Sequence, residues 1–342
     1  MTKKVSLKDV ANHLGVSAAL VSYVINNKEK EARVGPEMVK KIRKAAIELN
    51  YQPNLIAKSL KSGKTHTIGL IVADISNPFF SSIARIIEDE ARKQGYAVIF
   101  GSSDESTEKS QDLINVFLNR QVDAFIIAPA EKTEGQIKSL QKSKIPVVLI
   151  DRYFPTIEAD SVHIDNFQAA YEAVQHLINN GRKKIAMMAY KTSLPHMQER
   201  ITGYKAALKA NGIKFKKEWL RSASYQNIEK DVANEMNELL YPKAKADAIF
   251  FATNTLAVES LKVINQTKIK VPDDLAIISF DESDAFDFFY SPLSFVSQSL
   301  TDIGKEAVKL VINRIKKNED PYSTVIVKEQ LVIRKSCGYV NK

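Results

Sequence analysis

Charged and aromatic side chains follow several apolar segments of this 342-residue chain, where they could hold a small ligand. Asp151 and Arg152 come directly after one apolar run, Asp281 ends another, and Phe79 and Phe80 lie a few residues after a third. Carboxylates and a guanidinium around an aromatic ring are suited to fixing the hydroxyls of a sugar. Each residue alone is equally compatible with a capping, surface or packing role.

The same sequence offers little for catalysis. The five histidines have no metal-ligand spacing, and neither a Gly-x-Ser-x-Gly nor a Gly-x-Gly-x-x-Gly segment occurs. Gly63-Lys64-Thr65 resembles the end of a phosphate-binding loop, but position 58 is lysine where that loop requires glycine. Cys337 is the single cysteine, which excludes an internal disulfide and suits a reducing compartment. We therefore expect no enzymatic activity, no metal site and no cofactor.

The elements that would position these residues alternate regularly from Thr67 onward. Strands are expected at 68–73, 96–101, 123–128, 145–150, 184–189, 248–251 and 276–280, and helices at 78–95, 109–120, 136–142, 168–179, 198–210, 228–240 and 256–265. Apolar strands alternating with amphipathic helices predict doubly wound parallel sheets, here in two α/β units. Ligands of such sheets bind outside the carboxyl ends of the strands, where the candidate residues stand.

The first 64 residues differ from this body in charge and in pattern. They hold 13 Lys and Arg against 5 Asp and Glu, which is +8 of the chain's net +9. A short helix is expected from Ser6 to the turn at Gly15, a second after the cap residue Ser17, and a third from Pro36 to Leu49. Two short helices joined by a glycine-containing turn predict a helix-turn-helix, whose second helix enters the DNA major groove.

These first 64 residues, called the head below, also contain a set of motifs that occur together. The motifs are Val-Ser-Leu-Lys-Asp-Val-Ala at 5–11, Gly-Val-Ser at 15–17, Val21-Ser22, Asn26, and Leu-Asn-Tyr-Gln-Pro-Asn at 49–54. With these motifs the chain resembles the lactose-repressor (LacI/GalR) family of bacterial transcription regulators over essentially its whole length. The resemblance implies a two-lobed body of the periplasmic-binding-protein type I fold that clamps a ligand in its cleft. It also implies that the chain crosses between the lobes near residues 163, 290 and 325.

This interpretation divides the chain into four parts. Residues 1–50 are expected to form an all-α helix-turn-helix domain and residues 51–64 a hinge helix. Residues 65–163 with 291–325 are expected to form the N-terminal lobe, and residues 164–290 with 326–342 the C-terminal lobe.

The resemblance adds further ligand-binding residues in the body. Arg200, in Glu-Arg-Ile-Thr-Gly-Tyr at 199–204, matches the family arginine that grips the effector, and Asp281 matches its ligand carboxylate. Asn254 is followed by Thr255, where relatives usually have an aspartate, so one acid is missing. The expected ligand-binding set is Phe79, Phe80, Asp151, Arg152, Arg200, Asn254 and Asp281. A neutral sugar, a sugar phosphate and a sugar acid remain open as the ligand, and so does the direction of its effect.

The expected recognition helix departs from the family pattern. Leu20 stands where the family usually has threonine, and Tyr23 where it usually has arginine. Ala18 and Ala19 occupy positions of variable base readers, and alanine can contact a thymine methyl but cannot form a bidentate hydrogen bond. The head residues expected at DNA are Ser6, Ser17, Ala18, Ala19, Ser22, Tyr23 and Asn26.

Residues 53–63 resemble the family's hinge helix, which folds when two copies meet on DNA. The resemblance places Ala57 and Leu60 in the minor groove, with Leu60 as an apolar wedge that kinks the duplex. Lys58 would lie beside phosphates, which makes the affinity sensitive to salt. The hinge residues expected at DNA are Asn54, Ala57, Lys58 and Leu60. A plain linker helix is the alternative.

Together these observations predict a homodimeric repressor of carbohydrate-utilisation genes. It would bind double-stranded, near-palindromic operator DNA, with affinity controlled by a sugar-like small-molecule effector. The alternative is a catabolite-type regulator controlled mainly by a protein partner such as a phosphocarrier protein. No apolar run approaches the roughly 20 residues needed to span a bilayer, and the N-terminus leads into amphipathic sequence. We therefore expect a cytoplasmic protein without membrane contact.

Overall fold

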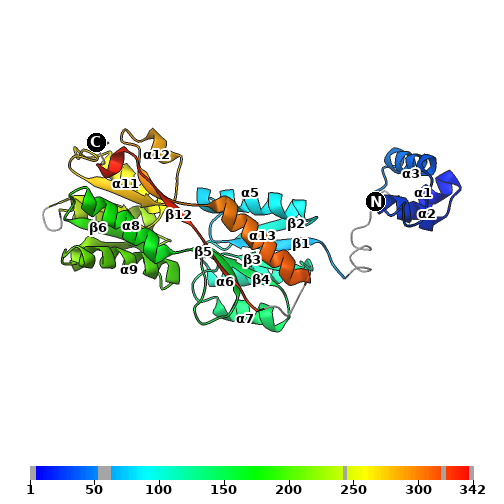
Figure 1. The fold of residues 1–342 in the computed structure, drawn as a ribbon, viewed down its shortest axis with the longest axis horizontal. Helices are drawn as coiled ribbons and strands as arrows, with labels where there is room; N and C mark the ends of the chain where they lie inside the picture. Colours follow the sequence, from blue (N-terminus) through cyan, green and yellow to red (C-terminus); the bar gives the residue numbers. More distant parts are fainter. Residues whose placement is uncertain (1–4, 53–62, 242–244, 317–320, 339–342) are drawn as a thin grey trace. The chain divides into compact units, whose positions relative to one another are not determined.

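The computed structural model describes residues 5–52, 63–241, 245–316 and 321–338, and divides the chain into two compact units, residues 1–65 and 66–342 (Figure 1). Within the described ranges no helix is long and apolar enough to cross a membrane.

The head unit consists of the helices α1 (Leu7–Leu14), α2 (Ala18–Ile25) and α3 (Pro36–Glu48). Ser6 and Asp9 form a reciprocal capping box at the start of α1, and Gly15 ends it in the left-handed conformation (φ 67°) that the tight turn requires. Ser17 then caps α2 by accepting a hydrogen bond from the Leu20 amide at 3.2 Å. The three helices enclose a small apolar core of Val10, Ala11, Val21, Val24, Val39, Ile42 and Ala45. The expected helix-turn-helix is confirmed.

The body unit contains two six-stranded sheets with the same strand order, so the expected pair of α/β units is confirmed. The first sheet runs β11 (Thr324–Val327), β5 (Asp160–Ile164), β4 (Val147–Ile150), β3 (Ala124–Ile127), β1 (Thr67–Val72), β2 (Ala97–Ser102). The second runs β12 (Glu329–Val332), β10 (Ser294–Gln298), β9 (Ala276–Phe280), β8 (Ala248–Phe251), β6 (Ile185–Tyr190), β7 (Leu220–Ala223). All these pairings are parallel except that of β12 with β10.

Helices flank each sheet (Figure 1). The first lobe has α5 (Pro78–Lys93), α6 (Thr107–Asn119), α7 (Glu134–Lys142) and α13 (Leu300–Lys316). The second has α8 (Asn166–Asn179), α9 (Pro195–Ala210), α10 (Ile228–Leu240), α11 (Asn254–Ile264), the short α12 (Ala285–Phe288), and the 3-10 turns η1 (Lys217–Trp219) and η2 (Lys335–Cys337). The central strands are buried along their length, as expected for parallel strands covered on both faces. Gly203 lets α9 approach α8, because a Cβ there would lie 2.3 Å from the Phe167 carbonyl oxygen.

The strand β10 corrects the expected lobe boundaries. Residues 291–325 were expected in the N-terminal lobe, but residues 294–296 pair with 278–280 of β9 in the second sheet. The chain therefore returns to the first lobe after Gln298, and the last crossing follows Val327 rather than residue 325. The placement of β10 is decided by its hydrogen bonds to the edge of the second sheet. The weakly apolar stretch Ser-Pro-Leu-Ser does not predict a strand there. The three crossings follow β5, β10 and β11, at matching edges of the two sheets.

The strand order also locates the site. In each sheet the chain proceeds outward in opposite directions from a central pair, β1 and β3 in the first lobe and β6 and β8 in the second. Side chains beyond the carboxyl ends of strands at such a reversal line the crevice that binds ligands in open α/β sheets.

Candidate functional site

Asp151 and Asp281 occupy equivalent positions in the two lobes. Asp151 follows β4 and its amide donates to the Val162 carbonyl at 3.0 Å, while Asp281 follows β9 and its amide donates to the Val296 carbonyl at 2.9 Å. Both residues have a φ of 63°, a left-handed conformation that is uncommon outside glycine. Both are buried. The polar residues expected after the strands therefore include two carboxylates in equivalent positions of the two lobes.

Arg200 of α9 provides a positive charge that interacts with both carboxylates. Its guanidinium lies 3.5 Å from the centroid of the Phe280 ring, and it donates to Asn166 Oδ1 at 2.9 Å and to the Ala252 carbonyl at 2.7 Å. Burial raises the pKa of Asp151 and that of Asp281, the latter to about 6, while the charge of Arg200 acts to lower both. The three groups thus form one electrostatic unit.

The raised pKa of Asp281 predicts a pH-dependent stability. The pKa of this carboxyl in the folded protein (about 6) lies above the reference pKa of 3.8. Its favourable contribution to the free energy of unfolding is therefore complete below pH 3.8 and is lost as the pH rises through 6. The lost contribution is on the order of 3 kcal/mol at 1.36 kcal/mol per pKa unit. We expect Asp281→Asn to gain unfolding free energy relative to the parent between pH 5 and 7.5 in urea titrations. The exposed Asp284→Asn is the control, and an equal difference at both pH values for Asp281→Asn would contradict the prediction.

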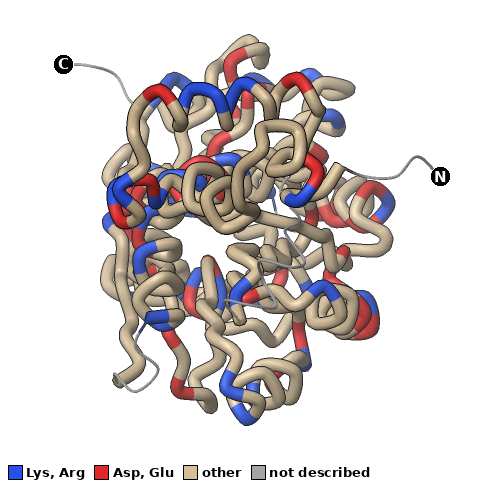
Figure 2. Tube along the Cα trace, turned by 90° about the vertical axis from the view of Figure 1, so that its right-hand side faces the viewer, with Lys and Arg blue, Asp and Glu red and all other residues tan. Residues whose placement is uncertain are grey.

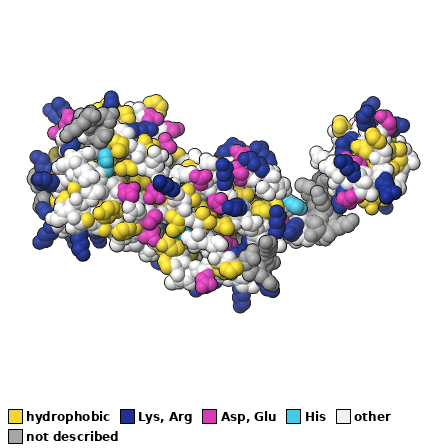
Figure 3. Space-filling view, in the orientation of Figure 1, with side chains coloured by type: hydrophobic (Ala, Val, Ile, Leu, Met, Phe, Trp, Pro, Cys, Tyr) yellow, Lys and Arg dark blue, Asp and Glu magenta, His cyan; other side chains and the backbone are white. Residues whose placement is uncertain are grey.

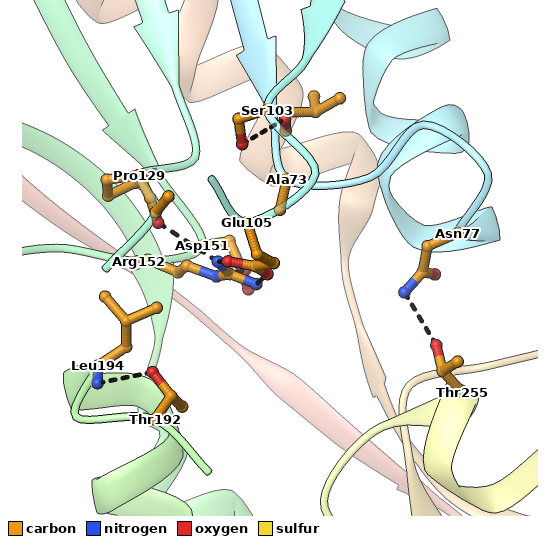
Figure 4. Close-up of polar contacts among 12 residues, drawn as sticks. Ala73, Asn77, Ser103, Glu105, Pro129, Asp151, Arg152, Thr192, Leu194 and Thr255 are labelled. Carbon is orange, nitrogen blue, oxygen red and sulfur yellow. Dashed lines mark hydrogen bonds and ion pairs between the residues drawn. The ribbon is translucent and has the colours of Figure 1, made fainter. Parts of the chain in front are cut away.

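Asn254, at the start of α11, makes a hydrogen-bonded bridge to the first lobe. Its Nδ2 donates to Asn77 Oδ1 at 3.2 Å and to the Glu282 carbonyl at 3.1 Å, and Asn77 Nδ2 donates to Thr255 Oγ1 at 3.3 Å (Figure 4). Asn77 caps α5 and Thr253 caps α11, so the starts of two helices face each other. The amide pair holds the lobes together on this side of the cleft.

A second contact between the lobes is made by the segment before α9. The Ser193 amide donates to Glu131 Oε1 at 2.8 Å, its hydroxyl donates to the same atom, and Leu194 is buried in an apolar cluster of the first lobe. The turn is shaped by a hydrogen bond from the Leu194 amide to Thr192 Oγ1 at 3.2 Å (Figure 4). Tyr153 adds a hydrogen bond to Glu199. The cleft is therefore closed.

Arg152 belongs to the cleft, but its hydrogen-bonding capacity is largely used within the protein. Two parallel hydrogen bonds of 2.7 and 2.8 Å join it to Glu105, with Asp151 alongside (Figure 4). Its guanidinium also lies 5.7 Å from the Phe80 ring centroid. Phe79 packs edge to face against Phe80, and both rings are buried. Phe80 thus lies against the cleft's arginine.

A pocket of about 410 Å³ opens beside Asp281, between the start of α5 and residues 281–284 and 297–301. Phe79 and Asp281 line it, whereas Arg152, Arg200 and Asn254 do not. Gln298 lines it too, and donates from Nε2 to Asp281 Oδ1 at 2.6 Å. The pocket therefore meets the predicted site at one flank only.

Several cleft residues were missed by sequence analysis: Asn77, Glu105, Tyr190, His196, Tyr225 and Gln298. Asn77 could have been found, because it caps a helix directly after the first body strand. Tyr190 and Tyr225 stack at 4.3 Å between ring centroids, from β6 and from the loop after β7. Burial, with the charges of Arg152 and Arg200, holds the pKa of His196 well below its usual value, so that imidazole is neutral. No local sequence pattern marks the side chains other than Asn77.

The expected DNA-contact residues of the head lie at the beginning of α1 and along α2. Ser17, Ala19, Tyr23 and Asn26 are exposed, and the last three follow the helical repeat along one face. Ala18 and Ser22 are half-buried, and Ser6 is an exposed cap. Asn26 Nδ2 donates to the Ser22 carbonyl at 2.8 Å. Asn54, Ala57, Lys58 and Leu60 lie outside the described residues.

Figure 3 shows Lys and Arg side chains over the visible face of the head, and Figure 2 shows Lys and Arg interspersed with Asp and Glu along the chain. Within the described part of the chain no group of three or more His, Cys, Asp or Glu side chains could hold a metal ion. The arrangement offers an exposed helical face on the head and a group of polar side chains between the two lobes of the body.

Comparison with known families matches both units. Residues 6–54 match the model described as bacterial regulatory proteins, lacI family, and residues 65–335 match the model described as periplasmic binding proteins and sugar binding domain of LacI family. The chain belongs to the LacI family. As a LacI-family protein it is a ligand-responsive, DNA-binding regulator of transcription.

Individual relatives and solved structures cover 79–98% of the chain. Catabolite control protein A of Priestia megaterium is 34% identical over 97% of this chain and 99% of its own. A LacI family regulator from Enterococcus faecium with bound ribose is 28% identical, with a TM-score of 0.70 over 79% of this chain and 98% of that one. The lac repressor dimer bound to operator and the anti-inducer ONPF shares the fold, with a TM-score of 0.86 at 21% identity over 98% of this chain and 99% of that one.

Proposed function

We propose that this LacI-family protein is a repressor of carbohydrate-utilisation genes that binds a near-palindromic operator as a homodimer. An uncharged sugar or sugar derivative in the interlobe cleft controls its operator affinity. The observation that carries this proposal is the equivalent placement of Asp151 and Asp281 at strand ends of the two lobes, where both interact with the charge of Arg200, with Asn254 bridging to the other lobe. The protein acts in the cytoplasm, where its DNA target lies.

The polar groups of the cleft suit hydroxyl recognition. Carboxylates accept hydrogen bonds from hydroxyls, while an amide such as Asn254 and a guanidinium such as Arg200 donate to them. Aromatic rings at Phe80 and Phe280 supply apolar faces beside the two arginines. An effector that contacts both lobes would favour one angle between them, which is the coupling that a ligand-controlled regulator requires.

Charge supports an uncharged ligand over a phosphate. The cleft contains the guanidinium groups of Arg152 and Arg200 against the carboxylates of Glu105, Asp151 and Asp281. Lys191 is exposed and lies near Asp231, whose pKa its charge helps to lower. Among the described residues of the cleft, the positive charges of the two arginines are therefore balanced by carboxylates.

The DNA part of the proposal rests on the exposed face of α2. Ser17, Ala19, Tyr23 and Asn26 would face base edges, with Ser6 at a phosphate. The hinge residues Asn54, Ala57, Lys58 and Leu60 would add minor-groove and phosphate contacts when two copies meet. Because relatives usually carry arginine in place of Tyr23, we expect an operator that differs from theirs.

The proposal can be tested with purified protein alone. Binding sites are first enriched from random duplexes, and the enriched site is then titrated by fluorescence anisotropy with neutral sugars, sugar phosphates and uronates. We expect a site with two-fold symmetry and a change in its affinity of roughly 5- to 150-fold with at least one neutral sugar, the usual range of allosteric coupling. Failure to enrich any site, or a response restricted to phosphates, would contradict it.

Control mainly through a protein partner is the second candidate. The 34% identity to a relative named catabolite control protein A favours it. In that case no sugar alone would change operator affinity, and addition of a phosphocarrier protein would.

A further inference from the structure

Glu105 fills the binding face of a cleft arginine. Arg152 Nη1 and Nη2 donate to the two carboxylate oxygens of Glu105 at 2.8 and 2.7 Å, and Nη1 also donates to the Pro129 carbonyl at 3.3 Å (Figure 4). Arg152 Nε lies 3.3 Å from Asp151 Oδ2. Both side chains of the Arg152–Glu105 pair are more than nine-tenths buried. A paired fork of this kind is the geometry in which arginine binds a carboxylate or phosphate ligand.

The backbone at Glu105 is held in an unfavourable conformation to reach this position. Asp104 and Glu105 have φ values of 49° and 56°, so two consecutive residues with side chains are left-handed. Each such residue costs roughly 1–2 kcal/mol. Local contacts compensate, because Ser102 Oγ donates to Asp104 Oδ1 at 2.7 Å and Lys109 pairs with Asp104. Strain maintained at a ligand site indicates a functional demand on the residue that it positions.

The second lobe also contacts Glu105. The phenol of Tyr225 lies close enough to the Glu105 carboxylate to interact with it, and Tyr225 stacks on Tyr190. Burial, followed by the charge of Glu105, raises the pKa of Tyr225 well above its usual value, so the phenol stays protonated and remains a donor. Burial alone would lower the pKa of Arg152, but the charge and hydrogen bonds of Glu105 hold it above its usual range. Glu105 thus pairs with a cation of its own lobe and lies beside a phenol of the other lobe.

We propose that Glu105 is an internal counter-ion that occupies Arg152 and restricts the cleft to uncharged ligands. This inference rests on the proposed function of the cleft as the effector site. A ligand anion would have to displace Glu105 and would face the remaining carboxylates of Asp151 and Asp281. A neutral ligand leaves the pair intact and uses the other polar groups.

The test removes the charge of Glu105 and measures thermal stability in inorganic phosphate and in glucuronate, at constant ionic strength. Glu105→Gln keeps a polar side chain of nearly the same size and frees the charge of Arg152. We expect both anions to raise the Tm of this variant and to bind it roughly tenfold or more tightly than they bind the parent. Glu108→Gln, which removes an exposed carboxylate three residues away, should behave like the parent.

A double variant, Glu105→Gln/Arg152→Gln, identifies the site of the gain. It lacks both charges, so we expect it to fold and to show no anion response. An anion response in the parent equal to that of Glu105→Gln would overturn the inference, and so would a gain that survives in the double variant. If Glu105→Gln is too unstable to study, Glu105→Ala with phosphate present during refolding serves instead, and absence of rescue by phosphate overturns the inference. The anion probes need no effector, so this result is separate from a failure of neutral sugars to bind.

Discussion

Replacing Arg200 with alanine is expected to lower effector affinity by at least about 30-fold, since losing the hydrogen bonds of a buried charged donor costs roughly 2 kcal/mol or more. The side chain is only 2% exposed and contacts Phe280, Asn166 and the Ala252 carbonyl, so alanine leaves these groups without their partner. Effector-induced thermal shift and isothermal titration measure the loss. Operator binding without effector should persist, because the head folds as a separate unit.

Arg221→Ala provides a matched control for this variant. Arg221 lies in β7 of the same lobe, is partly exposed, and pairs with Glu235. The same substitution there should leave effector affinity within about twofold, since partly exposed ion pairs contribute roughly 0–1 kcal/mol. An undiminished thermal shift in Arg200→Ala would show that the cleft has been assigned to the wrong residues.

Replacing Ile42 with alanine is expected to abolish operator binding while the effector response persists. Ile42 is fully buried in the small core of the head, and such a truncation costs roughly 2–5 kcal/mol. A core of this size supplies only about 3–5 kcal/mol in total, so the head should be largely unfolded. Anisotropy with operator DNA measures the loss, and thermal unfolding of the body with effector measures the retained response.

Ile47→Ala is the control, because it makes the same change on the same helix at a side chain that is 76% exposed. It should retain operator affinity. If Ile42→Ala bound operator as well as Ile47→Ala, the three-helix core would not be what maintains the DNA-binding surface.

The sequence predicted the parts of the site that local pattern determines. An apolar strand followed by an acid places Asp151 and Asp281 at strand ends whatever the details of packing, and the capped helices of the head follow from Ser6, Gly15 and Ser17. The matched strand orders then bring the two carboxylates to one cleft. Arg200 was expected from family resemblance, and its interaction with both carboxylates required the structure.

Glu105 could not have been found in this way. It stands among other acids in a loop, and its partner Arg152 is 47 residues away. Its left-handed backbone is not encoded by a glycine, so sequence gives no sign of the direction in which the side chain points. The strand β10 was not predicted for a related reason. Its pairing with β9 is a tertiary interaction, and the mixed polar sequence Ser-Phe-Val-Ser-Gln does not indicate a strand.

The contacts that close the cleft have a consequence for how effector preference can change. Leu194 and Ser193 join the lobes and are not among the residues expected to touch the ligand, so we expect them to set the fraction of molecules already in the binding-competent form. A ligand's apparent dissociation constant is its intrinsic one divided by that fraction. Changes at Leu194 would therefore scale the affinity for every sugar by one common factor. Different residues therefore determine how tightly the protein binds sugars in general and which sugar it prefers. The effector concentration at which the protein responds could change during evolution without a change in the preferred sugar.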